Sequence, residues 1–163
     1  MAPSKAKTTS DQKLATAILE VEQPMSLMQL CRRISNLREI PRVTPTLQTD
    51  IMNIARQSMY VVPDRKGFTV WLTEEASHSY TTYRQASGRD VMDIPMAEIK
   101  NVVLEAVTEQ FSINSDTLSL IAAKKLGFAR RGTNVDEALT IATQQLCAEG
   151  KIEIVDGNLR CRE

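Results

Sequence analysis

The feature that most constrains the fold of this chain is an order of elements that occurs twice. In each half, an amphipathic helix is followed by a second helix, a third helix and a hairpin. One face of the first helix is marked by apolar residues at spacings of three and four: Leu14, Ala17, Ile18 and Val21. The same spacing returns 85 positions later, at Ile99, Val102, Val103 and Ala106. Both stretches predict helices with one buried stripe, and together they indicate a duplicated unit.

Start signals mark the second and third helices of both halves. Ser26 with Gln29 forms a capping-box pattern, and Asn114 or Ser115 is the expected cap of the equivalent helix. Thr44–Pro45 places a cap before a proline at the first helical position, and Thr133 with Asp136 predicts another capping box. The apolar positions of these helices correspond at a separation of 88 (Leu30 and Leu118, Leu47 and Val135, Ile51 and Leu139). We therefore expect three extra residues in the second inter-helix connection, where 111–113 predicts a short strand.

A hairpin is predicted after each third helix. The stretches 60–62 and 68–71 read as strands joined by 63–67, and 152–155 and 158–160 read as strands joined by Asp156-Gly157, a strong turn signal. Three helices and a hairpin are the winged-helix order, so the predicted fold is mostly helical α+β with two tandem winged-helix-like units. The expected parts are a flexible basic tail at 1–9 with Lys5 and Lys7, unit 1 at 10–72, a linker at 73–94 and unit 2 at 95–163. A single mixed helical domain is the alternative.

The second half also resembles a bacterial domain of unknown function found at the C-terminal end of large superfamily-one helicase-like proteins. The matching residues follow a leucine-rich helix, a turn, a helix and a hairpin entry: Gly127, Phe128, Arg130, Gly132, Gly150, Lys151 and Ile152. In the first half, 40–43 stands where the turn belongs and 68–71 where the second strand belongs. The resemblance implies association with DNA transactions. No P-loop pattern is present, so it carries over no helicase motor.

Charge is unevenly divided between the halves. Residues 1–72 hold 10 basic and 6 acidic side chains, and residues 73–163 hold 10 basic and 14 acidic ones. A nucleic-acid partner should therefore rely on the first half, although such a difference is also common in a solvated surface. The candidate duplex-DNA contacts lie in the turns before the third helices, on those helices and at the first hairpin tip: Arg42, Thr46, Gln48, Thr49, Asn53, Arg56, Arg65, Lys66, Arg130, Arg131, Thr133 and Asn134. Two secondary basic doublets are Arg32-Arg33 and Lys124-Lys125.

Each of these candidates has a purely structural alternative. Arg42 and Arg130 could pin the turns against a carboxylate or a helix end, and the doublets complement the dipoles of the second helices without any ligand. Asp136 and Glu137 near the start of the second third helix would repel a phosphate there. The first unit is therefore expected to provide more of the DNA contact.

A second hypothesis is a protein-interaction adaptor within a larger, helicase-associated assembly, or a homodimer. Four of the seven methionines lie in the first unit (Met25, Met28, Met52 and Met59), and methionine suits adaptable apolar contacts as well as small cores. Tyr80 and Tyr83 could pack between the units or meet a partner.

Catalysis is not expected. Cys31 and Cys147 lie on predicted helices, Cys161 has no evident base, and His78 is the single histidine. Three cysteines without a CxxC spacing argue against disulfides and zinc fingers and favour a reducing cytoplasm. No apolar run approaches the roughly 20 residues that span a bilayer. We expect no cofactor, no small-molecule substrate and no membrane partner.

Overall fold

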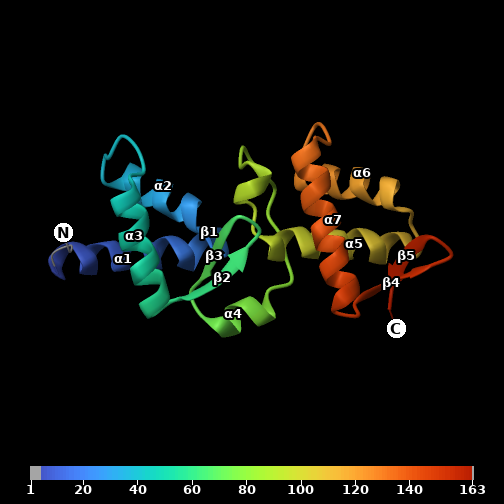
Figure 1. Ribbon diagram of the computed structural model, residues 1–163, viewed down its shortest axis with the longest axis horizontal. Helices are drawn as coiled ribbons and strands as arrows, with labels where there is room; N and C mark the ends of the chain where they lie inside the picture. Colours follow the sequence, from blue (N-terminus) through green and yellow to red (C-terminus); the bar gives the residue numbers. More distant parts are fainter. Residues whose placement is uncertain (1–4, 163) are drawn as a thin grey trace. The chain divides into compact units, whose positions relative to one another are not determined.

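The computed structural model describes the backbone of residues 5–162 and the side chains of residues 9–162 (Figure 1). Across that range the chain is mostly helical α+β, with seven α-helices, a three-stranded antiparallel sheet and a C-terminal hairpin. It divides into two units between Tyr80 and Thr81. Each unit has a hydrophobic core of its own.

Unit 1 consists of four helices and one small sheet. Its elements are α1 (Lys5–Glu22), β1 (Met25–Ser26), α2 (Leu27–Leu37), α3 (Pro45–Ser58), β2 (Tyr60–Asp64), β3 (Gly67–Trp71) and α4 (Glu74–Ser79). Helix α3 crosses α1 in Figure 1 and packs against α1 and α2. The strands have the order β1-β3-β2 and are all antiparallel, so β3 lies in the centre of the sheet. At the C-terminal end of β3, Trp71 meets Tyr80 edge to face, with ring centroids 5.3 Å apart.

The prediction of the inner face of α1 is wrong: the buried face is rotated about the helix axis by part of a turn from the predicted one. The structure buries Asp11, Ala15, Ile18 and Leu19, whereas Ala17 is exposed and Val21 is 84% exposed. The reason is an ion pair of 3.0 Å between Asp11 and Arg38, the residue that follows α2. Because the Asp11 carboxylate has this partner, it can face the core. A polar residue that the apolar pattern did not include thus belongs to the inner face of α1.

Unit 2 begins with an irregular segment that contains a short 3-10 helix (Val91–Asp93). Its elements are α5 (Met96–Gln110), α6 (Ser115–Leu126), α7 (Thr133–Ala148), β4 (Ile152–Val155) and β5 (Asn158–Cys161). Between α5 and α6, Ile113 makes a single antiparallel bridge with Leu159 of β5. The predicted strand at 111–113 is therefore reduced to one residue. The predicted α5 face is confirmed, because Ile99, Val102, Val103 and Ala106 are fully buried.

Both units contain three helices followed by a hairpin, and unit 1 has β1 and α4 in addition. The end of the first helix and the starts of the second and third helices are separated by 88 residues between the units. Helices α1 and α5 end at Glu22 and Gln110, and helices α3 and α7 begin at Pro45 and Thr133. The buried faces of α1 and α5 correspond at the same separation, since Ala15 and Ile18 align with Val103 and Ala106. The expected separation of 85 in the first helix, with three extra residues in the second connection, is therefore wrong.

Most predicted helix starts and turns are confirmed. The Ser26 hydroxyl accepts from the Gln29 amide at 3.0 Å, Thr44 Oγ1 accepts from the Leu47 amide at 3.1 Å, and Asn114 Oδ1 accepts from the Thr117 amide at 2.9 Å. The Asp156-Gly157 turn is confirmed, and both residues adopt the positive φ that such a turn requires. The first hairpin forms, but its predicted turn at 63–67 is too long: β2 and β3 pair as far as Asp64 and Gly67, which leaves a two-residue turn.

The Thr133–Asp136 capping box is wrong. Gly132 precedes α7 as its cap residue without a side-chain bond, and Thr133 is already helical. Asp136 instead forms an ion pair of 3.1 Å with Arg131, so its carboxylate does not reach back to the helix start.

The two segments predicted to be irregular both contain structure. Helix α1 already begins at Lys5, where lysine and alanine favour helix and no breaker intervenes; the side chains of Lys5 and Lys7 lie outside those described. The range 73–94 contains α4 and then a segment whose Ala86, Val91 and Ile94 are buried in the core of unit 2.

Candidate nucleic-acid interface

The exposed face of α3 is polar along its length. Thr44 and Pro45 begin the helix, and five inward residues fix its rotation: Leu47, Asp50, Ile51, Ile54 and Ala55. The exposed residues of α3 include four of the predicted contacts at helical spacing, namely Thr46, Thr49, Asn53 and Arg56, with Gln48 half-buried beside them. Thr49 Oγ1 donates to the Pro45 carbonyl at 3.0 Å. The structure therefore brings the predicted α3 contacts together on one surface.

Arg42 lies in the α2–α3 turn with an exposed side chain. The turn is closed by other groups: the Ile40 amide donates to the Ser35 carbonyl at 2.9 Å, and the Ser35 hydroxyl donates to the Ile40 carbonyl at 2.9 Å. Among the described residues Arg42 makes no ion pair. Its guanidinium is thus not required to hold the turn, and the structural alternative loses its basis.

At the β2–β3 hairpin tip the two predicted cations differ. Arg65 Nε pairs with Asp64 Oδ1 at 2.8 Å, both side chains are 8% exposed, and Thr69 Oγ1 donates to Asp64 Oδ2 at 2.7 Å. Arg65 is therefore engaged within the hairpin, whereas Lys66 is exposed. The Arg56 guanidinium lies 5.8 Å from the centroid of the Phe68 ring, so α3 and the hairpin share one continuous surface.

The doublet on α2 is largely occupied by its own helix and by α1. Arg33 pairs with Glu22 at 3.0 Å, and Arg32 Nη1 donates to Gln29 Oε1 at 3.1 Å. Both side chains remain exposed at the surface.

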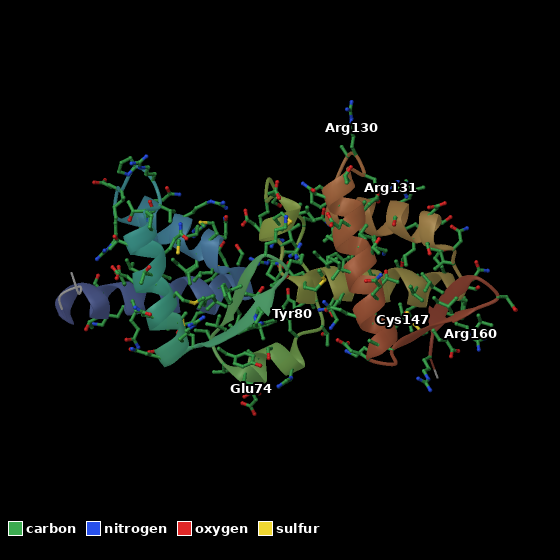
Figure 2. The ribbon with its side chains drawn as sticks, in the orientation of Figure 1. Glu74, Tyr80, Arg130, Arg131, Cys147 and Arg160 are labelled. Carbon is green, nitrogen blue, oxygen red and sulfur yellow. The ribbon has the colours of Figure 1, made fainter. Side chains whose placement is uncertain are left out.

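In unit 2 the two arginines of the α6–α7 turn have different surroundings. Arg130 is exposed and extends from the turn away from the ribbon (Figure 2), and it makes no ion pair within the described chain. Arg131 binds Asp136 and donates through Nη1 to the Asp116 carbonyl at 3.0 Å. Arg131 therefore ties the turn to both neighbouring helices, a role that the structural alternative had assigned to Arg130.

The lysine doublet of α6 is divided in the same way. Lys124 is exposed, but Lys125 Nζ lies 3.0 Å from Glu105 and 2.8 Å from Glu109 of α5. The two carboxylates raise the pKa of Lys125. Tyr83 donates to Glu105 at 2.5 Å, and this bond with that of Lys125 lowers the pKa of Glu105. Lys125 and Tyr83 therefore fasten α6 and the segment before α5 to α5.

The start of α7 offers less to a polyanion than that of α3. Thr133 and Asn134 are exposed as predicted, but Glu137 on the next turn is exposed as well. An exposed carboxylate in the first turns of the helix repels phosphate.

Sequence reasoning missed the carboxylate that holds the start of unit 2. Glu98 is fully buried and accepts from the Arg84 amide at 2.8 Å and from Arg89 Nη1 at 2.9 Å. Arg89 also donates to the Arg84 and Gln85 carbonyls. The available signal was the position of Glu98 directly before Ile99, on the inner face of α5, where a charge needs a partner.

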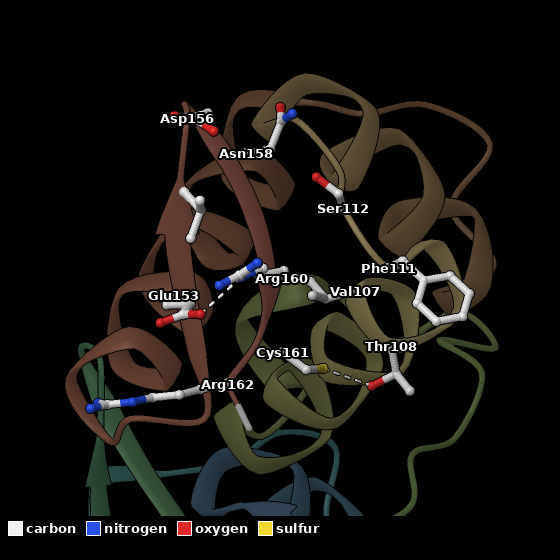
Figure 3. Close-up of a pocket in the computed structure, with 11 residues that line it drawn as sticks. Val107, Thr108, Phe111, Ser112, Glu153, Asp156, Asn158, Arg160, Cys161 and Arg162 are labelled. Atoms are coloured by element: carbon white, nitrogen blue, oxygen red, sulfur yellow. Dashed lines mark hydrogen bonds and ion pairs between the residues drawn. The ribbon is translucent and has the colours of Figure 1, made fainter.

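A groove of about 750 Å³ lies beside the β4–β5 hairpin (Figure 3). Its wall is the C-terminal end of α5 with Val107 and Phe111, and Phe111 is 85% exposed. On its other side, Arg160 donates to Glu153 at 2.8 Å, and Cys161 Sγ lies 3.1 Å from Thr108 Oγ1. The charged groups neutralise each other, so the groove has no net charge to attract a nucleic acid.

Protein-family models, curated proteins and solved structures provide no match to this chain. None of the described helices is long and apolar enough to cross a membrane. Within the same residues, no group of three or more His, Cys, Asp or Glu side chains could hold a metal ion. Burial raises the pKa of Cys31 to about 12, so this thiol stays protonated at neutral pH.

Proposed function

We propose that this chain is a non-catalytic DNA-binding accessory protein made of two winged-helix-like units, with unit 1 supplying the main contact to duplex DNA. Helix α3 is the third helix of unit 1, which is where a winged helix enters the major groove. The observation that carries the proposal is the exposed face of α3. It bears Thr46, Thr49, Asn53 and Arg56 without a carboxylate, because Asp50 points inward and is 8% exposed.

The placement of the cations supports the same conclusion. Arg42 precedes α3, Arg56 lies in its last turn, and Lys66 lies at the tip of the hairpin that follows. Ten residues of helix separate Thr46 from Arg56, or about 15 Å at 1.5 Å per residue, and the major groove of B-DNA is about 12 Å wide. Helix α3 would therefore span the groove with a cation near the phosphates of each strand. The face between these cations presents hydroxyl and amide groups, which are the groups that bind base edges.

Fluorescence anisotropy of a labelled duplex, titrated with the full chain at several salt concentrations, tests the proposal. Each phosphate contact contributes about 0.9 to the slope of log K against log salt. We expect Arg42→Gln and Lys66→Gln each to weaken binding to every duplex and to reduce that slope by about one contact.

Arg160→Gln is the matched control, since it removes the same charge from a cation that Glu153 neutralises. It should leave the affinity within about twofold, as a rim charge with its own partner does. Absence of binding by the wild-type chain at low salt would overturn the proposal, and so would equal losses in Arg160→Gln and Arg42→Gln.

A protein adaptor, in a helicase-associated assembly or as a homodimer, is the second candidate function. The exposed apolar side chains of unit 2 favour it, with Phe111 85%, Ile154 66% and Leu120 57% exposed. Light scattering of the wild type and of Phe111→Ser addresses the homodimer. A mass above the 18.2 kDa of one chain, returning to that value in the variant, would support it. A wild-type chain that stays monomeric would exclude it.

A further inference from the structure

The equivalence of the two units makes it possible to compare their surfaces position by position. The end of the first helix, the starts of the second and third helices and the buried face of the first helix correspond at a separation of 88 residues. The exposed positions of one unit can therefore be matched with those of the other. This comparison separates the exposed side chains that both units share from those that only one unit has.

The cation in the turn before the third helix is present in both units. Arg42 and Arg130 occupy equivalent positions 88 residues apart, three residues before Pro45 and Thr133. Both side chains are exposed, and neither makes an ion pair within the described chain. A guanidinium that extends from a turn into solvent can bind a phosphate without reading the sequence.

The exposed faces of the third helices differ at three positions that could contact a base. Thr49, Asn53 and Arg56 of α3 correspond to Glu137, Ile141 and Gln144 of α7. Glu137 adds an exposed negative charge, and Ile141 is half-buried against the core of unit 2. Arg forms a bidentate contact with guanine, and Asn or Gln forms one with adenine, in the major groove. Helix α7 keeps exposed amides at Asn134 and Gln144, but it has no arginine and exposes Glu137 where α3 has Thr49, so its face is less suited to base readout than that of α3.

We infer that the two units divide the work of DNA binding: unit 1 selects the base sequence through Asn53 and Arg56, and unit 2 binds phosphate through Arg130 without sequence preference. This division rests on the proposed DNA-binding function. It assigns specificity to one helix and assigns to Arg130 an affinity that is the same for all duplexes.

Selection from a randomised duplex pool with the full chain, followed by anisotropy with the selected duplex and a scrambled one, tests the division. We expect Asn53→Ala to reduce the ratio of the two affinities roughly tenfold, as loss of a bidentate base contact does. Gln144→Ala, the variant three positions beyond Ile141 on α7, is the matched control and should leave both affinities within about twofold. Arg130→Gln should weaken both duplexes equally and lower the salt slope by about 0.9.

Three results would overturn the division while leaving DNA binding itself established. These are a wild-type chain that binds selected and scrambled duplexes equally, a Gln144→Ala variant that selects a different sequence, and an Arg130→Gln variant whose affinity is unchanged. A wild-type chain that binds neither duplex at low salt would instead refute the proposed function. Thermal unfolding of each variant verifies that the altered chain is folded.

Discussion

The guanidinium of Arg56 lies over the ring of Phe68, with 5.8 Å between Cζ and the ring centroid. This contact joins the last turn of α3 to the second strand of the hairpin. It covers the half-buried ring and holds a flexible cation at the surface proposed to meet DNA.

Separate and combined substitutions at these two positions measure the contact. Phe68→Leu and Arg56→Gln should show a coupling of roughly 0.5–1 kcal/mol in a double-mutant cycle of urea unfolding, the range for an exposed cation–π pair. DNA affinity should fall in Phe68→Leu but show no additional loss in the Arg56→Gln background. A cycle of Phe68→Leu with Arg160→Gln is the control, and a similar coupling there would contradict the assignment.

Glu39 should weaken DNA binding in the wild-type chain. It is exposed in the α2–α3 turn, three residues before Arg42, and adopts a positive φ of 58°. Glu39→Gln keeps the size of the side chain and removes the charge, so affinity should rise roughly twofold to threefold at low salt and less at high salt. Glu75→Gln on α4 removes an equal charge elsewhere in the unit. An equal gain in both variants would show that net charge alone is responsible.

Arg89 should be important for the stability of unit 2. Glu98 is 0% exposed, and Arg89 reaches it with two nitrogens, at 2.9 and 3.1 Å. Within the described chain, removing Arg89 leaves the buried Glu98 charge with only the Arg84 amide and the Arg84 guanidinium, 3.4 Å away, so Arg89→Met should lower the free energy of unfolding by roughly 3 kcal/mol. Urea unfolding measures this. Arg160→Met breaks an exposed pair and should lower the free energy of unfolding by about 1 kcal/mol or less. Equal effects of the two substitutions would show that the bonds from Arg89 to Glu98 add little stability.

The Glu105 cluster should make stability depend on pH on the acid side. Bonds from Tyr83 and Lys125 lower the pKa of Glu105 below its ordinary value of 4.5. A carboxyl with a lowered folded pKa contributes stability that is present above its unfolded pKa and is lost as pH falls through the folded value. The melting temperature should therefore drop below pH 4.5 more steeply in the wild type than in Glu105→Gln. Parallel curves from pH 6 to 3 would argue against this contribution.

Local sequence signals predicted much of the fold because the groups involved lie close together in the chain. Thr44 caps α3 through an amide three residues away, and Asp156-Gly157 needs only its own dihedral angles to form a turn. The face of α1 was mispredicted because Asp11 is buried by Arg38, a partner that no local pattern identifies.

The same limit applies to the candidate site. Nothing local distinguishes Arg130 from Arg131 or Lys124 from Lys125, yet one member of each doublet is bound by carboxylates from other helices or turns. Residue type predicted which side chains could bind phosphate. Only the tertiary partners decide which of them remain available, because an ion pair is set by distance in space.

The burial of Ala86, Val91 and Ile94 against α5–α7 determines where the chain can be divided for separate expression. A fragment that starts at Pro95 would expose to water the apolar surface that these three side chains cover. It would also lose the bonds from Arg84 and Arg89 to Glu98. Cutting between Tyr80 and Thr81 keeps these three side chains with the core of unit 2, so recombinant halves made at that junction are the ones suited to spectroscopy on isolated pieces.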